Sequence, residues 1–198
     1  MLWKLGETGA PSHAWTRALL GLQAREIHVC GSLEAEALVR RLCERCGDDF
    51  ELRTYERMSE LKVVDEPLES YENVRAGDCV VAFSRKDIFS IREAKERLTA
   101  HKCCVVYGQL PPETRAKQAS LFNAEDSGYD VLVASDAIGM GLNLNIRRVV
   151  FHSTDKVQDT KAKQKGKVPV TMMKQIAGRA GRRSSQYKDQ GEVTCLKG

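Results

Sequence analysis

Apolar and polar residues follow a regular rhythm in the part of the chain that begins near residue 79. Short apolar runs, which predict β-strands, alternate with longer segments whose apolar positions recur at the spacing of an α-helix. The predicted strands are residues 79–83, 103–107, 131–134, 148–151 and 192–196, and the predicted helices are residues 86–99, 113–124 and a segment around Gln175. The runs VLVA and VVF are apolar throughout, as in strands whose two faces are both buried. The pattern predicts an α/β fold with a parallel sheet covered on both faces.

The N-terminal part of the chain has a less regular pattern. Helical spacing covers residues 14–22 and 33–46, where Ser32 is a candidate cap and Gly47 a candidate stop. Residues 26–30, 50–55 and 61–64 have strand character, residues 67–78 form an acidic, turn-rich stretch, and residues 155–167 form a polar, lysine-rich loop. We interpret the chain as a first segment (residues 1–66), a linker (residues 67–78) and a second domain (residues 79–198).

Composition adds a partner class to this picture. The 198 residues are 42% hydrophobic and 29% charged, which is typical of a soluble globular domain, and no run predicts a membrane span. From His152 onward, 11 Lys and Arg stand against 4 Asp and Glu, a balance of +7 within a total of +4. This basic part predicts an anionic partner.

The seven cysteines predict reduced thiols. Cys43 and Cys46 form a CxxC pair, but no second pair follows at the spacing of a zinc site, so we predict no metal site.

The segment Gln175 to Arg182 reads QIAGRAGR and concentrates cationic groups. If it is helical, Gln175, Arg179 and Arg182 share one narrow stripe, and two guanidinium forks beside an amide suit a phosphate. Gly178 and Gly181 lie opposite, where glycine suits close approach by another backbone. The alternative is a solvated basic helix.

A second glycine-containing segment, residues 131–144, reads VLVASDAIGMGLNL. Ser135 and Asp136 follow a buried strand, and Gly139 and Gly141 interrupt what comes next. The segment therefore presents amides and hydroxyls at close range to a ligand. For Asp136 the structural alternative is a helix cap.

Two strand ends complete the candidate site. Residues 79–87 read CVVAFSRKD, in which Ser84 begins an S-x-x-D capping box, and residues 107–112 read YGQLPP. Ligands of open α/β sheets collect at the carboxyl ends of the strands. Each pattern alone equally suits an ordinary capped helix or a stiff turn.

These motifs resemble those of superfamily 2 helicases. QIAGRAGR is similar to motif VI, ASDAIGMGLNL to motif V and CVVAFS to motif IV. Together with AWTRALLGL and YGQLPPETR, the sequences of these motifs resemble those of the mitochondrial degradosome RNA helicases of DExH type. The resemblance implies RecA-like domains of the P-loop NTPase type, the first only partly present.

The resemblance also implies roles for residues. Arg179 and Arg182 would be arginine fingers for ATP, and Gln175 would orient the attacking water or the phosphate. The nucleotide side would include Asp136, Gly139, Gly141 and Gly178. RNA contacts would come from Ser84, Arg85, Lys86, Tyr107, Gly108 and Ser135. Ser135 replaces the family's usual Thr and keeps the hydroxyl.

The sequence contains no GxxxxGK[ST] loop and no DExH tetrad. The resemblance therefore implies a second motor domain joined to the end of a first, with ATP and Mg held mainly by the missing part of that first domain. Implied partners are RNA, the first RecA-like domain and an exoribonuclease, in mitochondria and away from membranes. The isolated chain is expected to be inactive. Two alternatives stay open: a stand-alone, non-enzymatic RNA-binding module, and a RecA-like nucleotide enzyme unrelated to RNA.

Overall fold

The computed structural model describes residues 13–56, 59–139, 141–159, 164–181 and 190–197. The chain divides into two compact units, Met1–Glu56 and Arg57–Gly198. The second unit contains the sheet and every candidate site residue within the described ranges.

The first unit is helical. It contains α1 (His13–Gly21), the short 3-10 helix η2 (Leu33–Ala35) and α2 (Glu36–Cys46). Gly47 ends α2 in the left-handed conformation, with a φ of 74°, which confirms the predicted stop. Ser32 precedes η2, but its side chain makes no capping hydrogen bond.

The strands predicted at residues 26–30 and 50–55 do not form. A strand needs a neighbour to pair with, and the described residues of this unit offer none.

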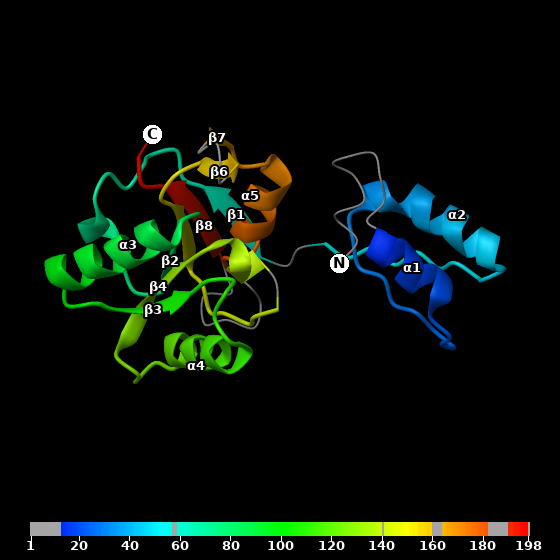
Figure 1. Ribbon diagram of the computed structural model, residues 1–198, viewed down its shortest axis with the longest axis horizontal. Helices are drawn as coiled ribbons and strands as arrows, with labels where there is room; N and C mark the ends of the chain where they lie inside the picture. Colours follow the sequence, from blue (N-terminus) through cyan, green and yellow to red (C-terminus); the bar gives the residue numbers. More distant parts are fainter. Residues whose placement is uncertain (1–12, 57–58, 140, 160–163, 182–189, 198) are drawn as a thin grey trace. The chain divides into compact units, whose positions relative to one another are not determined.

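The second unit is built on a six-stranded parallel sheet with the order β1-β8-β5-β2-β4-β3 (Figure 1). Its strands are β1 (Glu60–Val63), β2 (Asp78–Val81), β3 (Lys102–Val106), β4 (Tyr129–Ala134), β5 (Arg148–Phe151) and β8 (Gln190–Cys195). The predicted parallel α/β fold is confirmed. Every strand predicted from residue 79 onward is present, with ends shifted by no more than two residues.

The boundary between the segments differs from the one predicted at residue 66. β1 pairs in parallel with β8, with Lys62 opposite Glu192, so it is the edge strand of the second unit's sheet. The predicted linker then continues along β8, because the Leu68 and Glu69 amides donate to the Cys195 and Leu196 carbonyls at 2.9 and 2.7 Å. Backbone pairing across more than a hundred residues of sequence holds this segment on the sheet.

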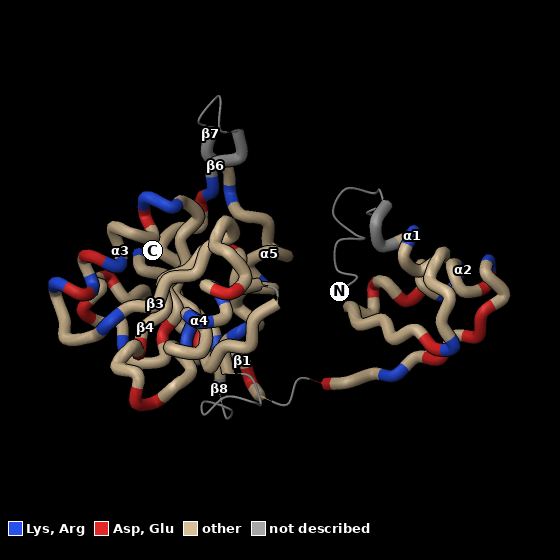
Figure 2. The backbone as a smooth tube through the Cα atoms, turned by 60° about the horizontal axis from the view of Figure 1, so that its bottom comes forward, with Lys and Arg blue, Asp and Glu red and all other residues tan. Residues whose placement is uncertain are grey.

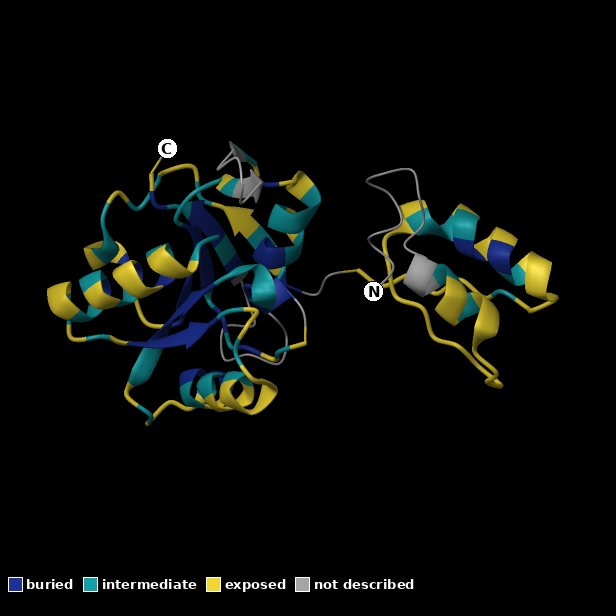
Figure 3. Ribbon diagram, viewed as in Figure 1, coloured by how far each residue is buried: buried dark blue, intermediate teal, exposed yellow. Residues whose placement is uncertain are grey.

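Helices cover both faces of the sheet, as the apolar strands predicted. α3 (Arg85–Leu98) and the 3-10 helix η3 (Tyr71–Asn73) pack on one face; α4 (Pro112–Asn123), α5 (Val170–Ala177) and the 3-10 helix η4 (Asp136–Gly139) pack on the other. Successive strand residues alternate between two apolar clusters, so that Val80 joins the first and Val81 the second. Figure 3 shows the buried strands and the exposed outer side of α3.

The lysine-rich segment predicted as a loop is instead an antiparallel hairpin. Its strands are β6 (Asp155–Asp159) and β7 (Gln164–Lys167), with Lys156 opposite Gly166. The Lys167 ammonium lies 3.1 Å from the Asp155 carboxylate across the ladder. Backbone pairing and this cross-strand charge pair form the hairpin without the apolar alternation that normally indicates one.

The described residues do not continue one helix through the segment that begins at Gln175, which is the condition for the shared stripe. α5 ends at Ala177, and Gly181 has a φ of 61° with its amide donating to the Ile146 carbonyl at 2.8 Å. The turn also packs closely on β8, because a Cβ on Gly191 would lie 2.6 Å from the Ala180 carbonyl oxygen. Arg182 lies outside the described residues.

Within the described ranges, no helix combines the length and apolarity that spanning a membrane requires.

Candidate functional site

The start of α3 fixes the first part of the site. Ser84 follows β2 and accepts a hydrogen bond at its Oγ from the Asp87 amide at 3.0 Å, so it is the predicted N-cap of α3. This cap places the positive end of a 14-residue helix at the carboxyl end of the sheet.

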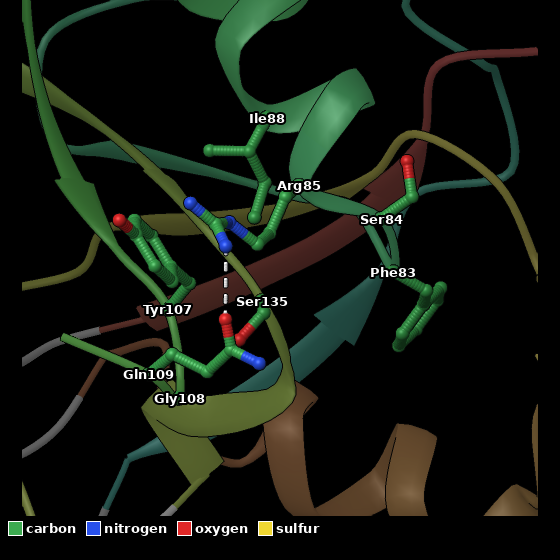
Figure 4. Close-up of a pocket in the computed structure, with 8 residues that line it drawn as sticks. All are labelled: Phe83, Ser84, Arg85, Ile88, Tyr107, Gly108, Gln109 and Ser135. Carbon is green, nitrogen blue, oxygen red and sulfur yellow. Dashed lines mark hydrogen bonds between the residues drawn. The ribbon is translucent and has the colours of Figure 1, made fainter.

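A pocket of about 150 Å³ opens beside this helix start (Figure 4). Its lining residues come from the loops after β2, β3 and β4 and from the first turn of α3: Phe83, Ser84, Arg85, Ile88, Tyr107, Gly108, Gln109 and Ser135. The structure thus brings together five of the six residues proposed for nucleic-acid contact. The sixth, Lys86, is exposed on α3 and does not line the pocket.

The Arg85 guanidinium is held by neutral partners. It lies 5.0 Å from the centre of the Tyr107 ring, and its Nη1 donates to the Gln109 Oε1 at 2.9 Å. Phe89 meets the Tyr107 ring edge-on at 6.0 Å. Among the described residues, no carboxylate lies within ion-pair distance of Arg85. Its positive charge therefore remains available to an external anion.

Sequence reasoning did not identify Phe83 and Gln109 as site residues. Both stand inside the quoted motifs CVVAFS and YGQLPP, so their positions after strands β2 and β3 were the available signal.

The segment after β4 turns sharply at the same carboxyl end of the sheet. The Ser135 Oγ accepts from the Ala137 amide at 3.1 Å and so starts η4. Ser135, and not Asp136, supplies this capping oxygen. The Asp136 carboxylate pairs instead with the Lys156 ammonium of β6 at 2.6 Å.

The two glycines of this segment serve different purposes. Gly139 lies against α5, where an added Cβ would be 3.2 Å from the Gln175 Nε2. Gly141 has a φ of 76°, and a Cβ added there would meet no atom within 4 Å, so backbone conformation and not crowding favours glycine at this position.

Gln175 and Arg179 meet the backbone of this segment. The Gln175 Nε2 donates to the Gly139 carbonyl at 3.0 Å, and the Arg179 Nη1 donates to the Leu142 carbonyl at 3.2 Å. The Arg179 Nη2 also donates to the Gly139 carbonyl. Gly178 ends α5, with its amide bonded to the Lys174 carbonyl at 2.9 Å. Of the residues predicted for the nucleotide side, Gln175 and Arg179 are therefore both in contact with Gly139.

The cysteines take no part in this site. All seven have free thiols, and burial raises the pKa of Cys103 to about 12 and that of Cys104 to about 11. Both thiols are thus protonated at neutral pH. In the part of the chain that the structure describes, no three His, Cys, Asp or Glu side chains gather as metal ligands.

Comparison with known proteins decides the family. Residues 60–184 match the helicase conserved C-terminal domain. The chain belongs to this helicase family. Residues 7–55 match the DEXQ-box helicase domain of Suv3. The parallel sheet of the C-terminal domain is RecA-like.

The relatives of this helicase C-terminal domain are long proteins. The ATP-dependent RNA helicase SUV3L, mitochondrial, of Oryza sativa subsp. japonica is 57% identical over 93% of this chain and 25% of its own length. The DExH-box ATP-dependent RNA helicase DExH18, mitochondrial, of Arabidopsis thaliana is 56% identical over 93% of this chain and 23% of its own. The ATP-dependent RNA helicase SUPV3L1, mitochondrial, of Homo sapiens is 46% identical over 92% of this chain and 23% of its own length. The chain thus spans about a quarter of the length of these relatives.

Proposed function

We propose that this chain forms the second motor domain, and the end of the first, of an ATP-dependent RNA helicase. The proposal is supported most by the pocket at the carboxyl end of the sheet, because its lining residue Ser135 directly precedes η4, whose last residue Gly139 accepts from Gln175 and Arg179. A helicase must couple nucleic-acid binding to ATP hydrolysis, and here the residues proposed for the two tasks share one backbone segment. The names of the matched relatives, which include ATP-dependent RNA helicases, agree with this proposal.

The pocket is suited to a backbone phosphate of RNA. Arg85 contributes a charged fork, Ser84 and Ser135 contribute hydroxyls, and Gly108 leaves room for close approach. The amides at the start of α3 add the positive end of the helix. Lys86, exposed one position further along α3, would contact a neighbouring phosphate. Recognition of this kind reads the strand's backbone and not its base sequence.

The nucleotide side depends on Gln175, Arg179 and Arg182. The Arg179 guanidinium donates to the Gly139 and Leu142 carbonyls, which fixes it on the segment after β4. We expect Arg179 and Arg182 to stabilise charge on the γ-phosphate when the motor domains close, while Gln175 orients the phosphate or the water. Bound ATP and Mg supply the transferable phosphoryl group and its counter-charge, held mainly by the first RecA-like domain. Asp136, Gly139, Gly141 and Gly178 shape the segments that carry these side chains.

The setting of the whole protein follows from its relatives. Because the matched helicases are named as mitochondrial, we propose the same compartment for the protein that contains this chain. An exoribonuclease partner, implied by the resemblance to degradosome helicases, stays a prediction.

A second candidate function is RNA binding without catalysis. It is favoured by the position of the pocket, whose lining residues all belong to the second unit. A chain with this function would bind RNA with or without nucleotide, whereas a motor domain changes its RNA affinity with the nucleotide state of the complete protein.

Turnover by the full-length protein tests the proposed function. Arg182→Ala should lower RNA-stimulated ATP hydrolysis by ~10³-fold or more, because an arginine finger acts on transition-state charge. RNA affinity should stay within about twofold of wild type, since finger and pocket are separate groups. Arg97→Ala, which removes an exposed charge on α3, is the control. Equal losses of turnover and RNA affinity would contradict the finger assignment.

A further inference from the structure

Lys156 joins the hairpin to two loops of the candidate site. Its ammonium lies 2.6 Å from the Asp136 carboxylate at the start of η4 and 5.9 Å from the centre of the Phe83 ring. Phe83 lines the pocket, and both side chains of the ion pair are about one-third exposed. One lysine from a polar hairpin therefore touches the loop after β2 and the loop after β4.

The backbone holds Lys156 in a fixed position. It is the second residue of β6 and pairs with Gly166 in β7. At the base of the hairpin, the Val168 amide donates to the Thr154 carbonyl at 2.8 Å, and the Val168 side chain is buried. Such a base restricts where the ammonium can go, so the ion pair ties two ordered elements together.

A second lysine of the hairpin provides an internal comparison. Lys167 pairs with Asp155 of the hairpin itself at 3.1 Å, and its side chain is 78% exposed. It carries the same charge as Lys156, and its side-chain partners among the described residues are Asp155 and the adjacent Thr154. Any effect of general positive charge should therefore appear at both lysines, and an effect of the link to Asp136 only at Lys156.

We propose that Lys156 is a positioning residue that couples the hairpin and the pocket to the nucleotide side of the site. The proposal rests on the proposed helicase function. Lys156 holds Asp136, the first residue of η4, and Gly139, the last, offers the carbonyl that Gln175 and Arg179 bind. Displacement of Phe83 or the hairpin by a bound strand moves the ammonium and, through η4, the Gly139 carbonyl.

The physical basis is a short, charge-assisted contact on a short, stiff element. At 2.6 Å the ammonium donates a strong hydrogen bond to the carboxylate. Without it, Asp136 turns toward water, and the first turn of η4 keeps only the Ser135 cap. RNA and ATP then bind to elements that no longer move together, which lowers their coupling more than either affinity.

Three variants of the full-length protein test this inference. Lys156→Met, which keeps the length of the side chain and removes its charge, should lower RNA-stimulated turnover by at least ~5-fold. The RNA concentration that gives half-maximal stimulation should change by less than about twofold. Lys156→Arg and the matched control Lys167→Met should both stay close to wild type. The proposal is wrong if Lys156→Met and Lys167→Met behave alike, or if Lys156→Met acts by raising the half-maximal RNA concentration.

Hydrogen exchange on this chain gives an independent readout. The amides of residues 136–139 should exchange at least about threefold faster in Lys156→Met than in Lys167→Met, because η4 loses a restraint. Equal exchange in the two variants would overturn the inference even if turnover falls. A wild-type protein without RNA-stimulated turnover would instead contradict the proposed function, and the exchange result would still decide the structural link.

Discussion

The strands of the six-stranded sheet are parallel, so their amino ends form one edge, here called the amino edge, and their carboxyl ends form the opposite carboxyl edge. The two edges use arginine in opposite ways. At the amino edge, Arg147 and Arg148 bind the fully buried Asp78 carboxylate at 2.7 and 2.6 Å. At the carboxyl edge, Arg85 lies on an aromatic ring and donates to an amide oxygen. The amino edge neutralises its arginines inside the protein, whereas the carboxyl edge keeps the charge of Arg85 uncompensated.

This difference separates stability from binding. The paired arginines satisfy a buried carboxylate, which also accepts from the Arg75 amide at 2.8 Å. Arg85 is held in place without losing its charge and is available to a phosphate. Figure 2 shows Lys and Arg on several elements of the second unit, α3 among them, so the presence of a cation does not by itself distinguish the two edges. The partners of each guanidinium distinguish the two edges.

The largest expected effect is on the amino edge. Asp78→Ala should lower the free energy of unfolding by ~3–5 kcal/mol, because it leaves the buried Arg148 without its carboxylate. Urea unfolding of the chain measures this change. Asp126→Ala, at an exposed position, should stay within about 0.5 kcal/mol of wild type. If Asp78→Ala unfolds like the control, the amino edge is not the stabilising edge.

Arg85→Ala should have the converse effect. Loss of a charge-assisted contact to phosphate of ~1.5 kcal/mol or more should weaken RNA binding about tenfold, measured by fluorescence anisotropy at fixed salt. Unfolding should change by less than about 0.5 kcal/mol, because Arg85 is exposed. Arg97→Ala, on the same helix, is the matched control. A large loss of stability with unchanged RNA affinity would make the two edges equivalent.

Gln109→Ala should weaken RNA binding about threefold. The Tyr107 ring still supports Arg85 when the amide is lost, so only part of its orientation disappears. Because Gln109 acts through Arg85, the double variant should bind RNA no more weakly than Arg85→Ala alone. Additive losses in this double-mutant cycle would show that Gln109 contacts RNA directly.

Local sequence signals predicted most of the sheet and the capped helix. The apolar runs at residues 131–134 and 148–151 and the S-x-x-D box at Ser84 are each encoded within a few residues. Ligands of such sheets bind at the carboxyl ends of the strands, and this rule predicted Tyr107 and Ser135 as neighbours. Both residues line the same pocket.

Long-range pairing explains what the sequence did not predict. β1 belongs to the second unit because it pairs with β8, a partner that no local pattern reveals. α5 ends early because Gly181 adopts a positive φ and bonds to Ile146. The ion pair of Lys156 with Asp136 depends on the fold of the hairpin, which no local sequence pattern indicated.

The salt dependence of RNA binding by this chain tests the central claim most directly. Affinity falls with salt concentration, and the slope of log affinity against log salt concentration is therefore negative. If Arg85 contacts a phosphate, this slope should become shallower by about 1 in Arg85→Ala and stay unchanged in Arg97→Ala. Equal slopes for the wild type and both variants would contradict the account, because the carboxyl edge would then contribute no phosphate contact through Arg85.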